Sequence, residues 1–581
     1  MIFPGRGGFF LSGILCICGI LGFGLWSCKS TGPVREIPLP VQAPETPEAP
    51  VRSGGVADEI RLLVETGVPS ALLRTLDLIR SRELGASEFG RIMNAVTVTV
   101  LRKLYPDVQA GFSPPDPPQT HPYTRILRDA DRGVYTPAPA NSTDYLECVL
   151  PFLALFPDAG GKPPPEERFL GALPDLLRAR ELKDDSVLAP YFLGVVYERS
   201  GRSREAEEEY RRAYTISQEC YPAVLGLARV MTALGQKQEA IALLADMVVR
   251  YPDNAAVKRQ LALAYYAAQD WSRAEAAVAE ILQRNNRDGE FILMRAHIFV
   301  ERGQFIQAQA PLDLYATINA NNRLYLFLRA RVQAEGYRNR DAALNYLRSL
   351  LRTYPNDDEI SVYAARLLME SPRPEDQREG QALLRNLLSA GQPSPMVIDL
   401  ALTDAVRREA WREARPYIER LLRERRSSQD LLNAYRVERG LGNNAAALSY
   451  AREIYERNPS DDEGAAAYIS ALIDTGRLDE AGRMIESRLA ALPRGTAKSQ
   501  YYYLRSRIRT NEESVMNDLR SSLFEDPRNL NALIAMFEIY HRHKDERRAV
   551  NYLKQALTIA PDNPLLKRYE VEYRAALGSA Y

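Results

Sequence analysis

The chain has 581 residues, which is too many for one ordinary compact core, so its length predicts several domains or an array of repeats. Its 75 lysines and arginines balance 75 aspartates and glutamates, which speaks against a nucleic-acid-binding protein, because such a domain normally carries a basic excess. Four histidines leave little material for metal or general-base chemistry, and five cysteines are too few for a disulfide scaffold.

The first 27 residues have the pattern of a bacterial export signal, with one arginine followed by the apolar run FFLSGILCICGILGFGLW. This run barely reaches the length that a membrane-spanning helix needs. Leu25 and Ser27 precede Cys28 in a way that resembles a lipobox, the motif at which signal peptidase II cuts and leaves an acylated cysteine. Trp26 departs from that motif, since a small residue is usual there. We expect Cys28 to carry lipid such as palmitate, and the alternative is an uncleaved anchor helix.

Residues 28–57 predict a proline-rich tether. The stretch holds six prolines and few large apolar residues, so it cannot bury enough surface to fold, and its prolines favour an extended form. At about 3.1 Å per residue it would reach roughly 90 Å. We therefore expect a lipid-anchored protein of the bacterial cell envelope with its body in the periplasm. Lys29 after the cysteine favours the outer membrane over the inner one.

Residues 58–182 predict a helical region without a clear repeat, because several segments place apolar residues at helical spacing. Pro69 and Ser87 are suitable helix starts. Residues 113–143 are rich in proline and predict a loop. The segments on either side of the next proline-rich stretch form one divergent helical pair, and Pro151 breaks the first of them.

From residue 183 to residue 564 the chain repeats itself, with a period of 34 residues in its first part. Each early unit has a small residue that allows two helices to approach closely, a glycine suited to a turn, and an alanine on the second helix. We count about eleven units, followed by a capping helix at residues 565–581. The unit with second helix 342–355 has one extra residue in the preceding turn. The recurring residues are Gly194, Ala228, Ala262 and Ala296; Gly201, Gly235 and Gly303; and Ala206, Ala240, Ala274 and Ala308.

This period resembles the tetratricopeptide repeat, a helix–turn–helix unit of 34 residues. The resemblance covers about two thirds of the chain. It implies an all-α fold, an α-solenoid in which the units stack as a right-handed superhelix. Together with the N-terminal pattern, it suggests a tetratricopeptide-repeat lipoprotein of bacteria.

The sequence contains no G-x-S-x-G, phosphate-loop, H-E-x-x-H or C-x-x-C motif. We therefore expect no enzyme activity, catalytic residue, metal site or cofactor. A hidden enzyme domain in residues 58–182 is the remote alternative. Cys148 and Cys220 predict two small buried thiols, and one disulfide between them is the alternative.

In tetratricopeptide proteins, certain positions of each first helix line a concave groove. Carried over to this sequence, these positions form a basic column beside aromatic residues, without the Lys/Asn pattern of the chaperone-binding clamp. We expect them to bind an acidic segment of another protein, because arginine grips carboxylates through paired hydrogen bonds. The open alternative is a solvated face whose arginines pair with Glu301, Glu335 and Glu370. The predicted groove residues are Tyr191, Arg229, Arg259, Tyr266, His297, Phe327, Arg331 and Arg366.

The expected function is a membrane-anchored periplasmic scaffold that binds other proteins through its groove and serves envelope assembly. The alternative is a small-ligand or lipid-binding accessory protein of a transporter. That alternative requires an enclosed apolar pocket, which we would place between the N-terminal helices and the first repeats. No nucleic acid is expected as a partner.

Overall fold

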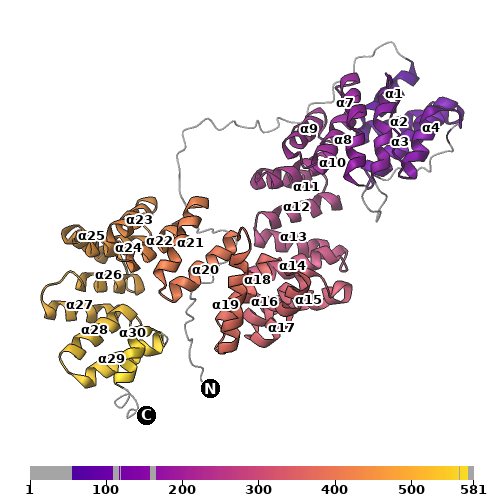
Figure 1. Ribbon diagram of the computed structural model, residues 1–581. Helices are drawn as coiled ribbons and strands as arrows, with labels where there is room; N and C mark the ends of the chain where they lie inside the picture. The colour runs from indigo at the N-terminus through magenta and orange to yellow at the C-terminus, as the bar shows by residue number, and fades with distance from the viewer. Residues whose placement is uncertain (1–54, 109–116, 118, 157–164, 562, 574–581) are drawn as a thin grey trace, which may run out of the picture. The chain divides into compact units, whose positions relative to one another are not determined.

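A computed structural model describes residues 55–108, 117, 119–156, 165–561 and 563–573 of the chain (Figure 1). Cys28, the predicted signal peptide and nearly all of the predicted tether lie outside the described residues. Every regular element within these ranges is helical, which confirms the all-α prediction. The chain divides into two compact units at residues 346 and 347. We call them the first and the second unit and describe each by itself.

The first unit begins with seven α-helices that precede the repeats. Ser87 caps one of them by accepting a hydrogen bond from the Gly90 amide, and Pro69 opens another. Short 3-10 turns, η1 (Leu84–Ala86) and η2 (Leu150–Leu155), interrupt the series, the second of them around Pro151. The helices are α1 (Val56–Thr66), α2 (Pro69–Ser81), α3 (Glu88–Leu104), α4 (Pro122–Asp131), α5 (Tyr145–Val149), α6 (Glu166–Gly171) and α7 (Leu173–Leu182).

Helix α4 corrects one expectation, because it occupies residues 122–131 of the stretch that we expected to be a loop. Pro122 stands at the first helical position, where its missing N–H costs nothing, and the His121 side chain accepts from the Tyr123 amide. The apolar side of the helix, including Leu127, is buried. The prolines therefore bound a helix here and do not prevent one.

Twenty-two helices follow, α8 to α29, and in chain order they make eleven pairs, the number of units expected. In the first unit the pairs are α8 (Leu188–Arg199) with α9 (Ser203–Ile216), α10 (Tyr221–Ala233) with α11 (Lys237–Arg250), α12 (Ala255–Ala267) with α13 (Trp271–Arg284), and α14 (Gly289–Glu301) with α15 (Phe305–Asn319). The fifth pair is α16 (Arg323–Arg331) with α17 (Arg340–Thr353), and the boundary between the units falls inside α17.

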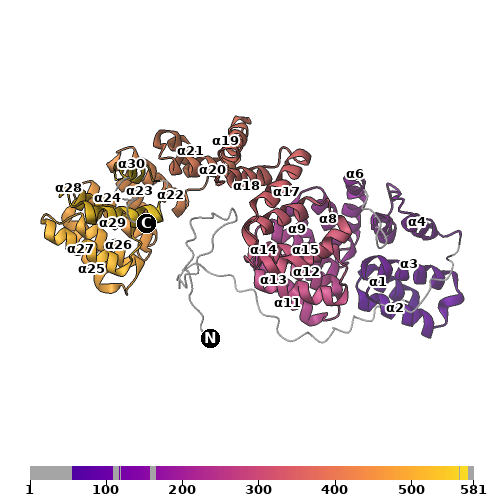
Figure 2. The same cartoon turned by 90° about the horizontal axis from the view of Figure 1, so that it is seen from below.

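The second unit continues the pattern. Its pairs are α18 (Asp358–Met369) with α19 (Pro374–Ser389), α20 (Pro395–Arg407) with α21 (Trp411–Glu424), α22 (Ser428–Gly440) with α23 (Asn444–Arg457), α24 (Asp462–Asp474) with α25 (Leu478–Ala491), α26 (Thr496–Ser506) with α27 (Glu512–Glu525), and α28 (Leu530–Arg542) with α29 (Glu546–Ile559). A last helix, α30 (Pro564–Glu572), packs on α29. In Figure 1, α26 to α29 follow one another in chain order, and each contacts the next. Figure 2 shows the same helices from below.

Small residues sit where helices cross, as the period predicts. A Cβ built on Gly194 would lie 2.5 Å from the Tyr210 ring, and one on Gly226 would lie 2.4 Å from the same ring. Tyr210 therefore fills the space between α8, α9 and α10 only because both positions are glycine. The alanines Ala206, Ala240, Ala274 and Ala308 are completely buried at the corresponding crossings.

The extra residue before helix 342–355 lies in a π-helical turn, η3 (Val332–Gly336), at the end of the first helix of that pair. The Tyr337 amide donates to the Val332 carbonyl five residues earlier. A π turn takes up one additional residue without breaking the helix. The insertion therefore lies within the first helix of the pair. The expectation that it lengthens the turn between the two helices was wrong.

The N-terminal helices share one hydrophobic core with the first repeats, and this core runs from Ile60 to Ala264. The Tyr105 hydroxyl donates to the Gly67 carbonyl at 2.9 Å, and the Asn254 amide donates to Asp107 at 2.7 Å. Cys148 and Cys220 are both buried and both free in this unit. They form no disulfide, in agreement with the prediction of two buried thiols.

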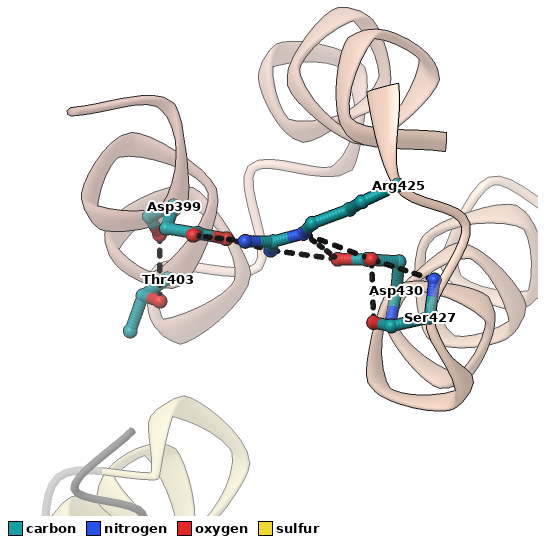
Figure 3. A network of polar contacts seen from close by, with 5 residues as sticks. All are labelled: Asp399, Thr403, Arg425, Ser427 and Asp430. Carbon is teal, nitrogen blue, oxygen red and sulfur yellow. Dashed lines mark hydrogen bonds and ion pairs between the residues drawn. The ribbon is translucent and has the colours of Figure 1, made fainter. Parts of the chain in front are cut away.

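In the second unit, polar contacts join consecutive helices (Figure 3). Arg425, just after α21, donates to both oxygens of Asp399 on α20 and to both oxygens of Asp430 on α22. Asp430 also accepts from the backbone amide and the hydroxyl of Ser427, which completes a capping box at the start of α22. One guanidinium thus fixes three consecutive helices.

Within the described ranges, no helix has both the length and the apolar character that crossing a membrane requires.

Candidate functional site

Two of the predicted groove residues lie in the core. Tyr191 on α8 is 7 % exposed and packs against Phe156, Phe192 and Tyr210. Phe327 on α16 is 4 % exposed. Neither side chain offers a surface to a partner, so we remove both from the predicted contact residues. The family positions place them correctly on first helices, but the side chains turn toward the neighbouring helices.

The remaining residues of the first unit lie on what we call the first-helix face, the surface on which side chains bridge one first helix to the next. Arg229 on α10 donates through Nε and Nη2 to Glu198 on α8, at 2.8 and 3.0 Å. The Tyr210 hydroxyl donates to the same carboxylate at 2.6 Å. Burial raises the pKa of Glu198, but the hydrogen bonds and charge of Arg229 outweigh it, so the net pKa is below the usual value.

Arg259 on α12 is held in the same way from α14. Its guanidinium pairs with Asp288 and donates to Glu290 at 2.8 Å, and it lies 4.4 Å from the centre of the Phe291 ring. Two carboxylates and one aromatic face therefore surround one positive charge.

Tyr266, His297 and Arg331 form a continuous chain of contacts across α12, α14 and α16. The Tyr266 hydroxyl is hydrogen-bonded to His297 Nδ1, and His297 Nε2 lies 3.4 Å from Glu301. Arg331 pairs with Glu301 and donates to Glu335 at 3.1 Å. The hydrogen bond from His297 and the charge of Arg331 lower the pKa of Glu301 to about 2, so this carboxylate is ionised at neutral pH.

Arg366, the last predicted residue, belongs to α18 of the second unit. Its guanidinium lies 5.8 Å from the Tyr363 ring centre. The arginines of the first unit are matched by carboxylates from the neighbouring repeat. Pairing with Glu301 and Glu335 was the alternative left open by the sequence, and the pairing of Arg229 and Arg259 was not foreseen.

The second unit holds a cluster that the sequence analysis missed. Asp474, the last residue of α24, accepts from Arg439 Nε of α22 at 2.6 Å and from Arg507 Nη2, just after α26, at 2.5 Å. Arg507 Nη1 also donates to the Ser470 hydroxyl at 2.9 Å. Tyr503 on α26 completes this group, which we call the Asp474 cluster.

The Asp474 cluster joins three successive first helices, so it lies on the first-helix face of the second unit. Its positions follow from the turns: Arg439 precedes the turn glycine Gly442 by three residues, and Asp474 precedes Gly476 by two. The two offsets differ, so counting back from the glycines would have indicated the region and not the pair. We had carried the groove positions only through the first six repeats.

Comparisons with known proteins agree with the repeat pattern. Two family models described as tetratricopeptide repeat match residues 198–264 and 238–298, and residues 166–223. No curated protein gives a significant match to the chain.

Several solved structures are similar to parts of this chain. PilF of Pseudomonas aeruginosa is 23 % identical and covers 34 % of this chain and 90 % of its own, with a TM-score of 0.31. A tetratricopeptide repeat protein from Parabacteroides merdae is 11 % identical and covers 50 % of this chain and 100 % of its own, with a TM-score of 0.35. PilW, a type IV pilus biogenesis factor, is 17 % identical and covers 34 % of this chain and 91 % of its own, with a TM-score of 0.31.

Proposed function

We propose that this chain, which carries tandem tetratricopeptide repeats, is a membrane-anchored scaffold of the bacterial envelope that holds other proteins on its first-helix face. The supporting observation is the series of arginines that bridge successive first helices and remain partly open to solvent. Arg229 is 44 % exposed, Arg259 37 % and Arg439 43 %. Arginine and aromatic side chains dominate the energetics of protein interfaces, and here both recur from repeat to repeat.

Anchoring through a lipid on Cys28 is the second part of the proposal. The lipobox-like residues before Cys28 and the proline-rich stretch after it support it. Several acyl chains would hold the protein stably, since each buried methylene contributes about 0.8 kcal/mol. Labelling cells with a palmitate analogue tests this part. We expect label on the wild-type protein and none on Cys28→Ala, and a Cys28→Ala protein that still takes up label would refute the assignment.

Capture of the full-length protein from crosslinked membranes tests the scaffold. Mass spectrometry of the captured material should find a reproducible set of proteins, absent from a parallel capture with an unrelated lipoprotein. Repeated capture without any enriched protein would contradict the scaffold.

One observation favours a small-ligand function as the second candidate. An open cavity of about 370 Å³ lies between α2, η1 and α3, and not beside the first repeats, where we expected an enclosed pocket. Leu76 and Ile79 line it together with the charged Arg80 and Glu83. Asn94 also lines it, and the buried Oδ1 atom of this side chain has no hydrogen-bond partner among the described atoms. A ligand with an apolar body and one donor group would suit this space. A metabolite or lipid that copurifies with the protein, in the absence of any protein partner, would support this candidate over the scaffold.

A further inference from the structure

Two arginines share one carboxylate in the Asp474 cluster. Arg439 and Arg507 approach Asp474 from the preceding and the following repeat, at 2.6 and 2.5 Å. Both positive charges face Asp474 directly, and a second carboxylate, that of Glu538 on α28, lies near Tyr503. Asp474 is 15 % exposed in its side chain, so the two guanidinium groups meet it at a partly dehydrated surface, where charge interactions are stronger than in bulk water.

The cluster also has hydrogen-bond donors to spare. Arg439 reaches Asp474 through Nε alone, and its two Nη groups donate to no residue of the described chain. The Tyr503 hydroxyl likewise makes no hydrogen bond within the described ranges. Burial raises the pKa of Tyr503, the charges of Arg507 and Arg439 act against this rise, and those of Glu538 and Asp474 add to it. Both guanidiniums therefore lie near the hydroxyl. A carboxylate beside Arg439 would meet the guanidinium fork and this hydroxyl together.

The paired arginines of the first unit use more of their donors on carboxylates than Arg439 does. Arg229 is matched by Glu198, and Arg259 contacts both Asp288 and Glu290. An acidic partner segment would have to displace these carboxylates. The free donors of Arg439 therefore move the predicted acid-binding site from the first unit to the second.

We infer that the Asp474 cluster receives a carboxylate of a bound protein segment, through Arg439, Tyr503 and Arg507. This inference rests on the proposed scaffold function and specifies the chemistry of its partner. The cluster spans α22, α24 and α26, so it suits an extended segment that crosses three repeats. The carboxylate comes either from an acidic side chain or from the C-terminus of the segment, and the same donors fit both sources.

A matched pair of variants tests the site in the full-length protein. Arg439→Gln removes the cation and its two free Nη groups, and Arg436→Gln is its control. Arg436 lies three residues earlier on the same helix, is similarly exposed, and pairs one-to-one with Glu463 at 2.9 Å. Arg439→Lys keeps the charge but loses the planar fork. Unchanged circular dichroism would show that each variant is folded.

Three fluorescent peptides of equal length serve as probes, with binding followed by anisotropy. One carries glutamates and an amidated end, one carries glutamines and a free carboxyl end, and one carries glutamines and an amidated end. We expect at least one carboxylate-bearing peptide to bind about tenfold tighter than the amidated glutamine peptide, a ratio worth roughly 1.4 kcal/mol. Whichever of the two binds identifies the source of the carboxylate.

Arg439→Gln should lose about tenfold in affinity for that peptide and Arg439→Lys about fivefold, whereas Arg436→Gln should change it less than twofold. Equal binding of all three peptides, or equal losses in the Arg439 and Arg436 variants, overturns the inference. A protein partner that Arg439→Gln captures as well as the wild type overturns the inference but leaves the scaffold function standing. Peptide binding that depends on Arg439 without any captured partner supports the site and contradicts the scaffold.

Discussion

At the scale of single residues, carboxylates shared between repeats hold the first-helix face together, and Glu301 is the clearest case. Its pKa is about 2, against about 4.3 for an unfolded glutamate, so its ionised form stabilises the folded state. This stabilisation is present above about pH 5 and is lost as the pH falls toward 2. Glu301→Gln should therefore cost about 1–2 kcal/mol at pH 7 and nearly nothing at pH 2.

Urea unfolding of both proteins at several pH values checks this prediction. Glu456→Gln is the control, because Glu456 forms only an exposed pair with Arg452 four residues earlier on α23. A Glu301→Gln deficit that stays constant from pH 7 to pH 2 would show that the loss comes from packing and not from the charge.

Arg425 provides the second prediction at this scale. It fills four acceptor positions on two carboxylates, and Asp430 is completely buried (Figure 3). Arg425→Ala would leave that carboxylate buried without its cation and should cost about 3 kcal/mol. Arg425→Lys keeps one charge but cannot reach both carboxylates in parallel, so we expect a loss of about 1–2 kcal/mol. Thermal melts of these variants measure the losses. Arg452→Lys, in the exposed pair with Glu456, is the control and should be near neutral.

Single residues also show where sequence reasoning ends. The family positions correctly selected residues on first helices, yet Tyr191 and Phe327 turned out to be buried. The partners of Arg229 and Arg439 lie 31 and 35 residues away, in adjacent repeats. A pattern along the chain gives the position of a side chain on its helix, but its orientation and its ion pairs depend on how two repeats pack together.

At the scale of elements, one backbone conformation recurs in the turns between the two helices of most pairs. Gly201, Gly235, Gly303, Gly442 and Gly476 all have positive φ there, and Gln269 takes the same place at φ +60°. The hydrogen bonds are the same too: the Gln236 amide donates to the Met231 carbonyl at 2.8 Å, and the Asp270 amide donates to Tyr265 at 3.0 Å. This is the 6→1 bond of a Schellman motif, which favours glycine.

Gln269→Gly should therefore stabilise the third pair, by about 0.5–1 kcal/mol, because it removes the strain of a side chain in the left-handed region. The gain is smaller than the strain itself, since glycine also makes the unfolded chain more flexible. Thermal denaturation of the full chain measures the shift.

Gly235→Ala is the reverse experiment at the equivalent turn. Nothing lies within 4 Å of a Cβ built there, so the expected loss of about 1 kcal/mol is purely conformational. If Gln269→Gly destabilised the protein while Gly235→Ala also did so, the side chain of Gln269 would have to contribute a contact that outweighs its backbone strain.

The same scale explains which elements the sequence predicted. Turn glycines and buried alanines recur because the repeats share a tight turn and a close crossing of two helices. The period therefore predicted the helix pairs well. Helix α4 was missed because prolines in the surrounding stretch suggested a loop, although Pro122 only starts the helix. The π turn at residues 332–336 was missed because an inserted residue leaves no mark on composition, and only the packing of α16 and α17 decides where it goes.

At the scale of the whole molecule, the chain has several separate hydrophobic cores. One extends from Ile60 to Ala264 in the first unit, and another from Ile398 to Leu504 in the second. In repeat proteins each unit contacts mainly its neighbours, so stability spreads only over nearby repeats. The N-terminal helices are an exception to simple repetition, because they share the core of the first repeats and close that end of the array.

A substitution that destabilises one repeat should therefore affect only the repeats close to it. Leu431 and Leu193 are both completely buried, the first in α22 and the second in α8. Truncation of either to alanine should cost about 2–5 kcal/mol. In native-state hydrogen exchange, Leu431→Ala should lower protection in α20 to α25 and leave α8 to α13 unchanged, and Leu193→Ala should give the opposite result. If either variant lowered protection equally in both units, the chain would unfold as one cooperative body. The division into two units would then describe only the contacts between residues and would not predict how stability is distributed.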